Sequence, residues 1–177
     1  MGSKVKNNKN NTKEERVINE EKRNELILAL KKKYELLKKK TGLSVDLDDL
    51  DKEFIIKDAV LKEGFVPETL LWFLRSRMID YITSWLGFLH ALIIPNPHNL
   101  VEVTEASLFN DETKKEIRKL ISHIRFLSAE NSVVSLSRDD KKEAMMIDKL
   151  YKNWVEELKP KIKSLVMKVR DNWKENI

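Results

Sequence analysis

Apolar residues recur at three- and four-residue steps along most of the chain, which is the pattern of helices that bury one face. The stretch 13–40 has a single narrow apolar stripe, made of Ile27, Leu30, Tyr34 and Leu37. Gly42 then follows at a position where a helix commonly ends. We therefore predict a long first helix over 13–40, with only one side able to pack against other elements.

Four more helices are predicted, over 46–63, 67–94, 111–134 and 138–175, with a loop and one short helical piece over 98–109. Acidic residues gather at the start of the first of these, where the exposed amides of a helix are positive. Pro67 fits the first turn of the next helix, and Pro95-Asn96-Pro97 breaks it. Ser137 and Asp140 have capping-box spacing at the start of the last helix, and Pro160 is placed to kink it.

Composition supports an all-α fold. The chain has only four Gly and four Pro among 177 residues, and 41% of its residues are hydrophobic, so it can form one core but has little turn chemistry for sheets. We predict an antiparallel helical bundle with a long basic N-terminal helical arm. The arm and first helix are 1–41, and the bundle is 42–177. In this prediction the bundle packs around helix 67–94, and the arm projects or packs onto a neighbouring copy.

The segment Met78–Ile94 raises the question of a membrane. It is mostly apolar but at the short limit for spanning a bilayer, and Asp80 and His90 interrupt it. We interpret it as a buried central helix, with a membrane-associated helix as the alternative. The first residues lack the apolar core of a secretion signal, so Sec-type export is not expected.

Positive charge is concentrated at the N-terminus. The first forty residues contain thirteen Lys and Arg against six Glu, a surplus of +7 in a chain whose net charge is +5. The triplets 31–33 and 38–40 lie seven residues apart, so we expect them to recur on one side of the helix. Such an arm neutralises phosphates of a nucleic acid without reading its sequence. The predicted nucleic-acid-binding residues are Lys4, Lys6, Lys9, Lys13, Arg16, Arg23, Lys31, Lys32, Lys33, Lys38, Lys39 and Lys40.

The rest of the charge pattern leaves alternatives open. The six Glu within the arm are equally typical of a solvated helix that binds nothing. A second basic cluster lies after Lys159, and the middle of the chain is acidic, so copies could attract one another end to middle. The absence of Gln and Cys, together with 36% charged residues, fits a source that grows at high temperature.

No catalytic chemistry is predicted. The three histidines, His90, His98 and His123, lie far apart, and none follows a Glu at the spacing that di-iron bundles use. The sequence also lacks a zinc-protease motif, a phosphate-binding Gly-rich loop, a Gly-x-Ser-x-Gly elbow and any Cys. We therefore expect a protein that is not an enzyme and has no catalytic residues, no metal site and no cofactor.

The order of these segments resembles the major capsid proteins of filamentous and rod-shaped viruses of thermophilic archaea, most of all the lipothrixvirus type. The likeness is carried by the arm Lys4–Lys40, the apolar helix Pro67–Ile94 with its proline break, and the terminal helices 111–134 and 138–175. It covers the whole chain as an architecture and has no specific motif. The six Glu within the arm depart from a purely basic wrapping segment.

The resemblance implies capsid subunits that pair, wrap linear double-stranded DNA in A-form with their N-terminal helices, and stack into a helical filament. Its partners would be double-stranded DNA and either identical copies or a related capsid subunit, with an enveloping membrane possible but not required. Its location would be the virion, and otherwise the cytoplasm. The main alternative is a cytoplasmic helical subunit that binds RNA or a ribonucleoprotein within a larger complex. A peripheral membrane protein that uses Met78–Ile94 is a third interpretation.

Overall fold

The computed structural model describes residues 8–175, with side chains from Glu20 onward, and every regular element in this range is a helix. The prediction of an all-α fold is therefore confirmed. The elements are α1 (Asn8–Thr41), α2 (Leu47–Phe54), α3 (Ile56–Glu63), α4 (Leu70–Ser84), α5 (Leu86–Ala91), α6 (Leu100–Ser107), α7 (Asp111–Ser137), α8 (Asp140–Asn153), a π-helical turn (Trp154–Leu158) and α9 (Lys159–Glu175).

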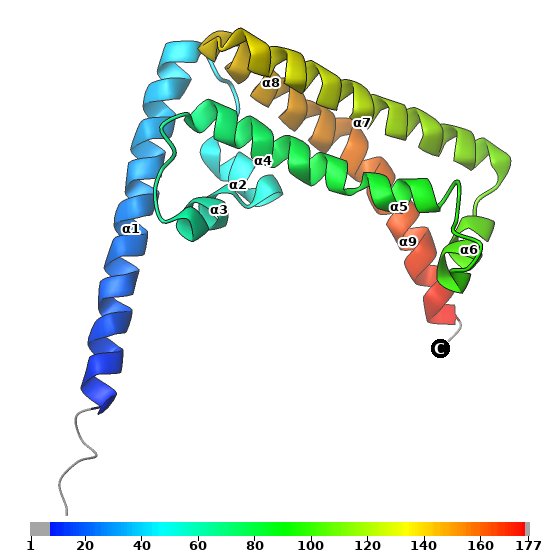
Figure 1. The fold of residues 1–177 in the computed structure, drawn as a ribbon, viewed down its shortest axis with the longest axis horizontal. Coiled ribbons are helices and arrows are strands. Elements are labelled where there is room, and N and C mark those ends of the chain that lie inside the picture. Colours follow the sequence, from blue (N-terminus) through cyan, green and yellow to red (C-terminus); the bar gives the residue numbers. More distant parts are fainter. Residues whose placement is uncertain (1–7, 176–177) are drawn as a thin grey trace, which may run out of the picture.

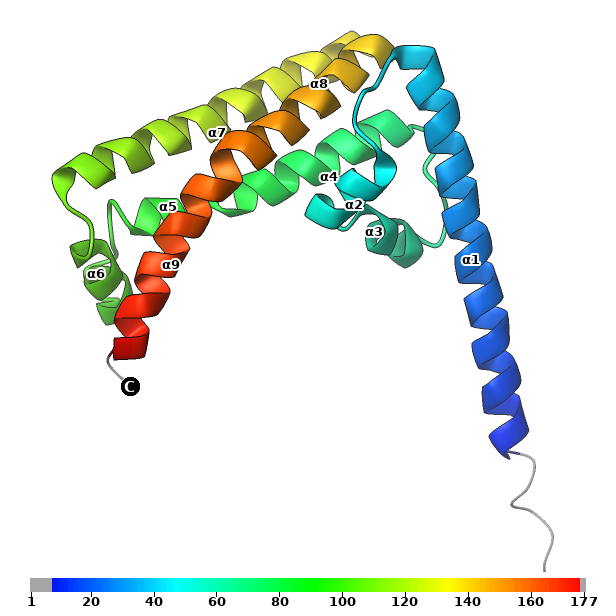
Figure 2. The ribbon, with the colours of Figure 1, turned by 180° about the vertical axis from the view of Figure 1, so that it is seen from behind.

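The helices form an arch, seen from its two sides in Figures 1 and 2. Helices α4, α7 and α8 pack against one another along the top of the arch. Helix α1 stands at one end and crosses them steeply, and its N-terminal half extends beyond the rest of the chain. At the other end, α6 and the end of α9 lie together, joined by a hydrogen bond of 2.9 Å from Trp173 Nε1 to Glu105 Oε1.

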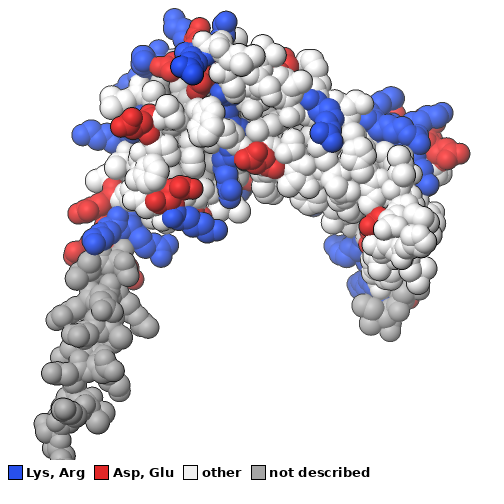
Figure 3. Space-filling model, viewed as in Figure 1, with Lys and Arg blue, Asp and Glu red and all other residues white. Residues whose placement is uncertain are grey.

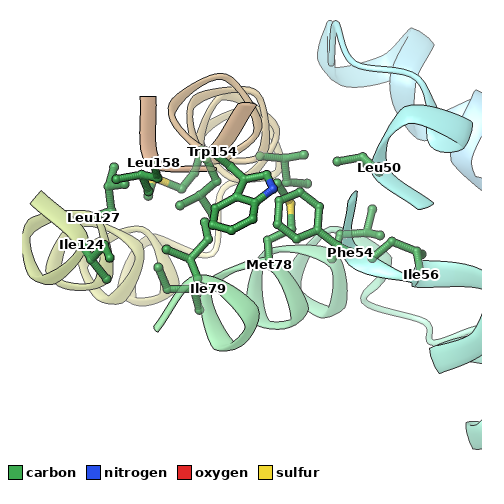
Figure 4. Close-up of a cluster of buried hydrophobic side chains, with 14 of the residues drawn as sticks. Leu50, Phe54, Ile56, Met78, Ile79, Ile124, Leu127, Trp154 and Leu158 are labelled. Carbon is green, nitrogen blue, oxygen red and sulfur yellow. The ribbon is translucent and has the colours of Figure 1, made fainter. Parts of the chain in front are cut away.

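The core lies where α2, α4 and the α8–α9 junction meet. Phe54 and Tyr81 pack edge to face with ring centroids 5.7 Å apart, and Tyr81 and Trp154 do so at 5.3 Å. Figure 4 shows Phe54 and Trp154 meeting beside Met78. Large aromatic side chains bury much apolar area, so this cluster joins elements that are 100 residues apart in sequence.

Met78–Ile94, the apolar segment, does not form one helix. It is divided between α4 and α5, and its side chains at Met78, Ile82, Leu89 and Leu92 are buried in the core. No helix in the described range 8–175 has both the length and the apolar content needed to cross a bilayer.

Two predicted helix boundaries were wrong in the segment that follows α1. The predicted helix 46–63 is broken at Ile55, which adopts a left-handed backbone with φ of 56° and separates α2 from α3. The break is stabilised locally, because Asp51 accepts a hydrogen bond from the Lys57 amide at 2.7 Å. The next helix begins at Leu70, after Pro67, so that proline lies in the preceding loop and not in the first turn.

The predicted capping box at Ser137 and Asp140 was also wrong. Helix α7 continues to Ser137, and Asp139 is the residue that caps α8, its side chain accepting from the amides of Lys141 at 2.8 Å and Lys142 at 3.2 Å. The pKa of Asp139 is lowered by these two backbone hydrogen bonds. The cap therefore acts two residues later than the sequence pattern indicated.

Pro160 changes the last helix in a specific way. A proline has no amide to donate to the carbonyl four residues earlier, and its ring crowds that carbonyl. The chain widens just before it into the π-helical turn Trp154–Leu158, in which the Lys159 amide donates to the Trp154 carbonyl. The predicted single helix 138–175 is thus two helices joined by this turn.

Candidate nucleic-acid interface

The C-terminal half of α1 packs on the rest of the described chain, residues 43–175, which is called the body below. Leu30 and Tyr34 are fully buried there, against α3 and α8. The Tyr34 hydroxyl donates to the Val45 carbonyl at 2.7 Å, and burial raises the pKa of Tyr34 well above its usual value. Gly42, with φ of 78°, ends the helix as predicted. This half of α1, residues 26–41, is called the stem below.

The two lysine triplets of the stem recur after seven residues, member by member, but neither triplet gathers in a single direction. Three consecutive helical residues span about 200° around the axis, so each triplet points in three directions. Lys31 and Lys38 lie on the side of α2, while Lys33 and Lys40 lie on the opposite flank.

On the α2 flank, the lysines meet acidic residues of the body. Lys38 forms an ion pair with Asp46, and Lys31 lies close enough to Asp48 to affect its ionisation. The pKa of Asp48 is lowered first by a hydrogen bond from Lys57 and then by the charges of Lys57 and Lys31. The acidic start of α2 therefore attracts the stem.

The other flank is held in the same manner. The Lys33 ammonium donates to the Pro67 carbonyl at 2.8 Å, and Lys40 forms an ion pair with Asp140 at 2.7 Å. Together the two flanks place Lys33, Lys38 and Lys40 in contacts within the chain. These three lysines fix the stem to the body, so they are less available to a polyanion than the sequence suggested.

Lys32 and Lys39 point outward, away from the core. Both are exposed, and neither has an ion pair or hydrogen bond to any described residue. Two apolar side chains share this outer side, Leu28 and Leu36, which are 68% and 63% exposed. The outward side of the stem is therefore mixed in character.

The N-terminal half of α1 has a different relation to the body. Arg23 is exposed, and the backbone of Lys9, Lys13 and Arg16 lies in α1, although their side chains fall outside the described residues. Lys4 and Lys6 lie outside the described range altogether. The backbone of this half extends past the other helices in both ribbon views (Figures 1 and 2), and at its C-terminal end Arg23 lines a hollow together with Leu61 and Gly64 at the end of α3.

One helical register connects the two halves of α1. The buried stripe of the stem occupies register positions 27, 30, 34 and 37, at three- and four-residue steps. The same steps continue towards the N-terminus through positions 23, 20, 16, 13 and 9, which are Arg, Glu, Arg, Lys and Lys. Because α1 is continuous, the register that is apolar in the stem carries four basic residues and one acidic residue, Glu20, towards the N-terminus. We call Lys9, Lys13, Arg16 and Arg23 the basic row.

Charges of both signs are mixed on the described part of the face that Figure 3 shows. In Figure 3, Lys and Arg gather at both ends of the arch with Asp and Glu among them, and most of the surface between is uncharged. A hollow of about 830 Å³ lies between the end of the stem, α4 and the α7–α8 turn. Its charged lining has both signs, being Lys40, Arg138, Glu68, Asp140 and Glu143.

A buried polar network beside this hollow was not predicted. Arg75 of α4 is fully buried and donates to the Asn131 side-chain oxygen at 2.5 Å and to the Ser135 hydroxyl at 3.3 Å. Its guanidinium lies 3.4 Å from the Glu143 carboxylate. Arg75 gave no sequence signal beyond its position in the most apolar helix. Within the described range, no group of three or more His, Asp or Glu side chains could hold a metal ion.

The chain matches no family model, and comparison with curated proteins and with solved structures finds no similar protein.

Proposed function

We propose that the protein is a structural subunit that packages nucleic acid and has no catalytic role. In this proposal the N-terminal half of α1 contacts the phosphates of double-stranded DNA without sequence preference, and the body associates with other copies into a helical filament. The finer description of the fold, an antiparallel bundle that carries a basic arm, belongs to the same proposal. A viral capsid protein of the filamentous archaeal type, located in the virion, would have this organisation.

The observation that carries the proposal is the change along the register of α1. In the stem, that register is apolar and packs on the body. Towards the N-terminus, the same register positions are those of the basic row, along the part of the α1 backbone that extends past the other helices (Figure 1). Four basic positions on one side of a projecting helix are suited to follow a phosphate backbone. Glu20 lies on the same register between Arg16 and Arg23 and offsets one of these four charges, whereas Glu14, Glu21 and Glu25 fall at other register positions.

The docked stem supports the same proposal. Leu30 and Tyr34 anchor the stem between two flanks of lysine contacts, so α1 leaves the body in a fixed direction. A fixed direction lowers the entropy cost of binding, because the helix is already ordered before it meets DNA. Contacts to phosphates alone position a protein and specify no sequence.

The test is DNA binding by full-length variants at a series of salt concentrations, measured by fluorescence anisotropy with a duplex probe. Arg16→Ala/Arg23→Ala removes two charges from the basic row. Lys32→Ala/Lys39→Ala removes two charges from the outward side of the same helix, and is the matched control. We expect the first variant to lose about tenfold or more in affinity and its log–log salt slope to fall by about 2. The control should change much less.

The outcomes separate the competing interpretations. Equal losses in both variants, or no salt dependence in the unaltered protein, would refute contact through the basic row. Electron microscopy of the protein mixed with linear duplex DNA tests assembly. Filaments that lengthen with the DNA support a packaging subunit, whereas discrete particles formed only with RNA would favour the ribonucleoprotein alternative. Binding to neutral-lipid vesicles that survives high salt would favour the membrane alternative.

A further inference from the structure

Helix α7 has an apolar stripe that faces away from its own core. Its buried side chains are Ile117, Leu120, Ile121, Ile124, Leu127 and Asn131. On the opposite side, Phe126, Val133 and Leu136 are 56%, 67% and 85% exposed, and Ala129 between them is exposed as well. No described element covers this second stripe. Exposed apolar groups that gather in one row mark an interaction surface more often than scattered ones do.

The spacing of the stripe is that of a coiled coil. Residues 126, 129, 133 and 136 follow one another at steps of three, four and three, which are the a and d positions of two heptads. The residues that face the molecule's own core then fall at the b, c and f positions. A second helix could therefore pack onto the stripe without disturbing the core.

Charged residues beside the stripe determine which helix can pack on it, and whether that helix runs parallel or antiparallel to α7. In this register Arg125 is a g position and Glu130 is the e position of the next heptad. In a parallel two-stranded coiled coil, a g residue lies beside the e residue five positions further along the other chain. Arg125 of one copy would thus meet Glu130 of another, twice by symmetry. In an antiparallel pair these two residues would not meet.

We propose that the occupant of the stripe is α7 of a second copy, packed in parallel about a two-fold axis. Arg125 is exposed and has no ion pair with any described residue, so it is free to bond across the interface. Glu130 already accepts from Lys149 at 2.6 Å, and Lys149 also lies 5.3 Å from the Phe126 ring centroid. Lys149 therefore holds the carboxylate beside the stripe, where a second cation can reach it.

The stripe ends at a defined point. The preceding a position is Lys119 and the preceding d position is Ser122, so the apolar contact cannot extend towards the start of α7. Two heptads bury less than a standard protein interface, and we expect a weak dimer in dilute solution. Weak pair contacts suit a subunit whose copies gather on a long polymer, since each neighbour adds to the effective concentration. In this respect the inference rests on the proposed function and deepens it by naming the subunit contact.

The first experiment is sedimentation velocity on the full chain without nucleic acid, from about 10 µM to about 1 mM. Leu136→Lys places a charge in the stripe, and Leu100→Lys makes the same change at a Leu on α6 that is 79% exposed. We expect Leu136→Lys to weaken dimerisation at least tenfold and Leu100→Lys to leave it unchanged. An unaltered protein that stays monomeric throughout, or equal effects of the two variants, would overturn the proposal.

The second experiment tests direction by charge exchange. Arg125→Glu and Glu130→Arg should each weaken the homodimer, because each places like charges across the interface. A mixture of the two variants should form a heterodimer, since every pair then regains opposite charges. Circular dichroism melts of each variant check that the fold is retained. Failure of the folded variants to form the heterodimer would contradict parallel pairing.

The absence of cysteine allows a third, covalent test. Equivalent a positions face each other in a parallel pair at a distance that a disulfide can span. Val133→Cys should therefore cross-link to itself under mild oxidation. If Val133→Cys cross-links only when mixed with Ala129→Cys, the pairing is antiparallel and the proposal fails. These measurements contain no DNA, so their outcome is independent of whether α1 binds nucleic acid.

Discussion

Replacement of Arg75 by Met tests the buried network where α4, α7 and α8 meet. The guanidinium is fully buried and has four hydrogen bonds through Nη1 and Nη2 to Asn131 and Ser135, the longest at 3.3 Å. Its Nε has no partner, so nothing is lost there on substitution. Met is unbranched and of similar length, so Arg75→Met removes the donors and the charge while leaving most of the packing.

Two costs and one gain determine the magnitude. The Glu143 side chain, 13% exposed, loses its buried cation, and removal of one partner from a buried pair costs about 3–5 kcal/mol. The 3.4 Å separation and partial exposure place this pair at the lower end. The two Asn131 oxygens also lose their donor, which costs about 1–3 kcal/mol more. Because the Met side chain itself gains from burial, roughly 2 kcal/mol, we expect a net loss of about 3 kcal/mol.

Urea unfolding followed by circular dichroism at pH 7 measures this loss. The companion variant is Arg75→Met/Glu143→Met, in which the lone carboxylate is removed as well. We expect the double variant to be more stable than Arg75→Met by at least about 1 kcal/mol, because a buried unpaired charge is the larger part of the cost. If Arg75→Met lies within about 0.5 kcal/mol of the unaltered protein, or the second substitution adds a further loss, the reasoning is refuted.

Two further predictions concern the joint between α2 and α3. Burial raises the pKa of Glu53, but hydrogen bonds from Lys159 and Trp154 outweigh it, and the net pKa is lowered. A lowered folded pKa gives stability that is present above the unfolded value of about 4.3 and lost as pH falls through the folded pKa. In Glu53→Gln, the free energy of unfolding should therefore decrease less steeply as pH falls below about 5, as measured by urea unfolding at a series of pH values. The same pH dependence in Glu53→Gln as in the unaltered protein would contradict this. Ile55→Asn should raise the unfolding free energy by about 1 kcal/mol, because Asn tolerates the left-handed backbone that a β-branched residue does not. A melting temperature that falls in Ile55→Asn would show that the 49% exposed Ile55 side chain contributes packing that exceeds the strain.

Periodicity located the helices well and their interruptions poorly, and Ile55 shows why. The residues around it continue a helical pattern, and Ile is an unlikely choice for a left-handed backbone. The break is imposed by tertiary contacts, since Leu50, Phe54 and Ile56 must all reach the core. The π-helical turn before Pro160 is the opposite case. Proline predicted an irregularity there, but whether the helix kinks or widens depends on how Trp154 and Leu158 pack.

The candidate site, too, could be predicted from the sequence only in part. Consecutive lysines cannot share a helical face, so the geometry of the triplets was available from the sequence. Their partners were not, because Asp46 and Asp140 come from different parts of the chain and meet α1 only in the folded molecule. The heptad stripe of α7 can be seen in the sequence. Only the burial of the other side of α7 shows that the stripe does not pack in the core of its own chain.

The relation between the stem and the basic row determines what α1 can do. The stem brings lysines to both flanks of a buried apolar stripe, and their ion pairs with Asp46 and Asp140 oppose rotation of the helix about its axis. A helix that cannot rotate keeps one register along its whole length, so the register positions of the basic row continue those of the buried stripe of the stem. Charge in the stem thus orients the arm, whereas charge beyond the body is what remains for a polyanion.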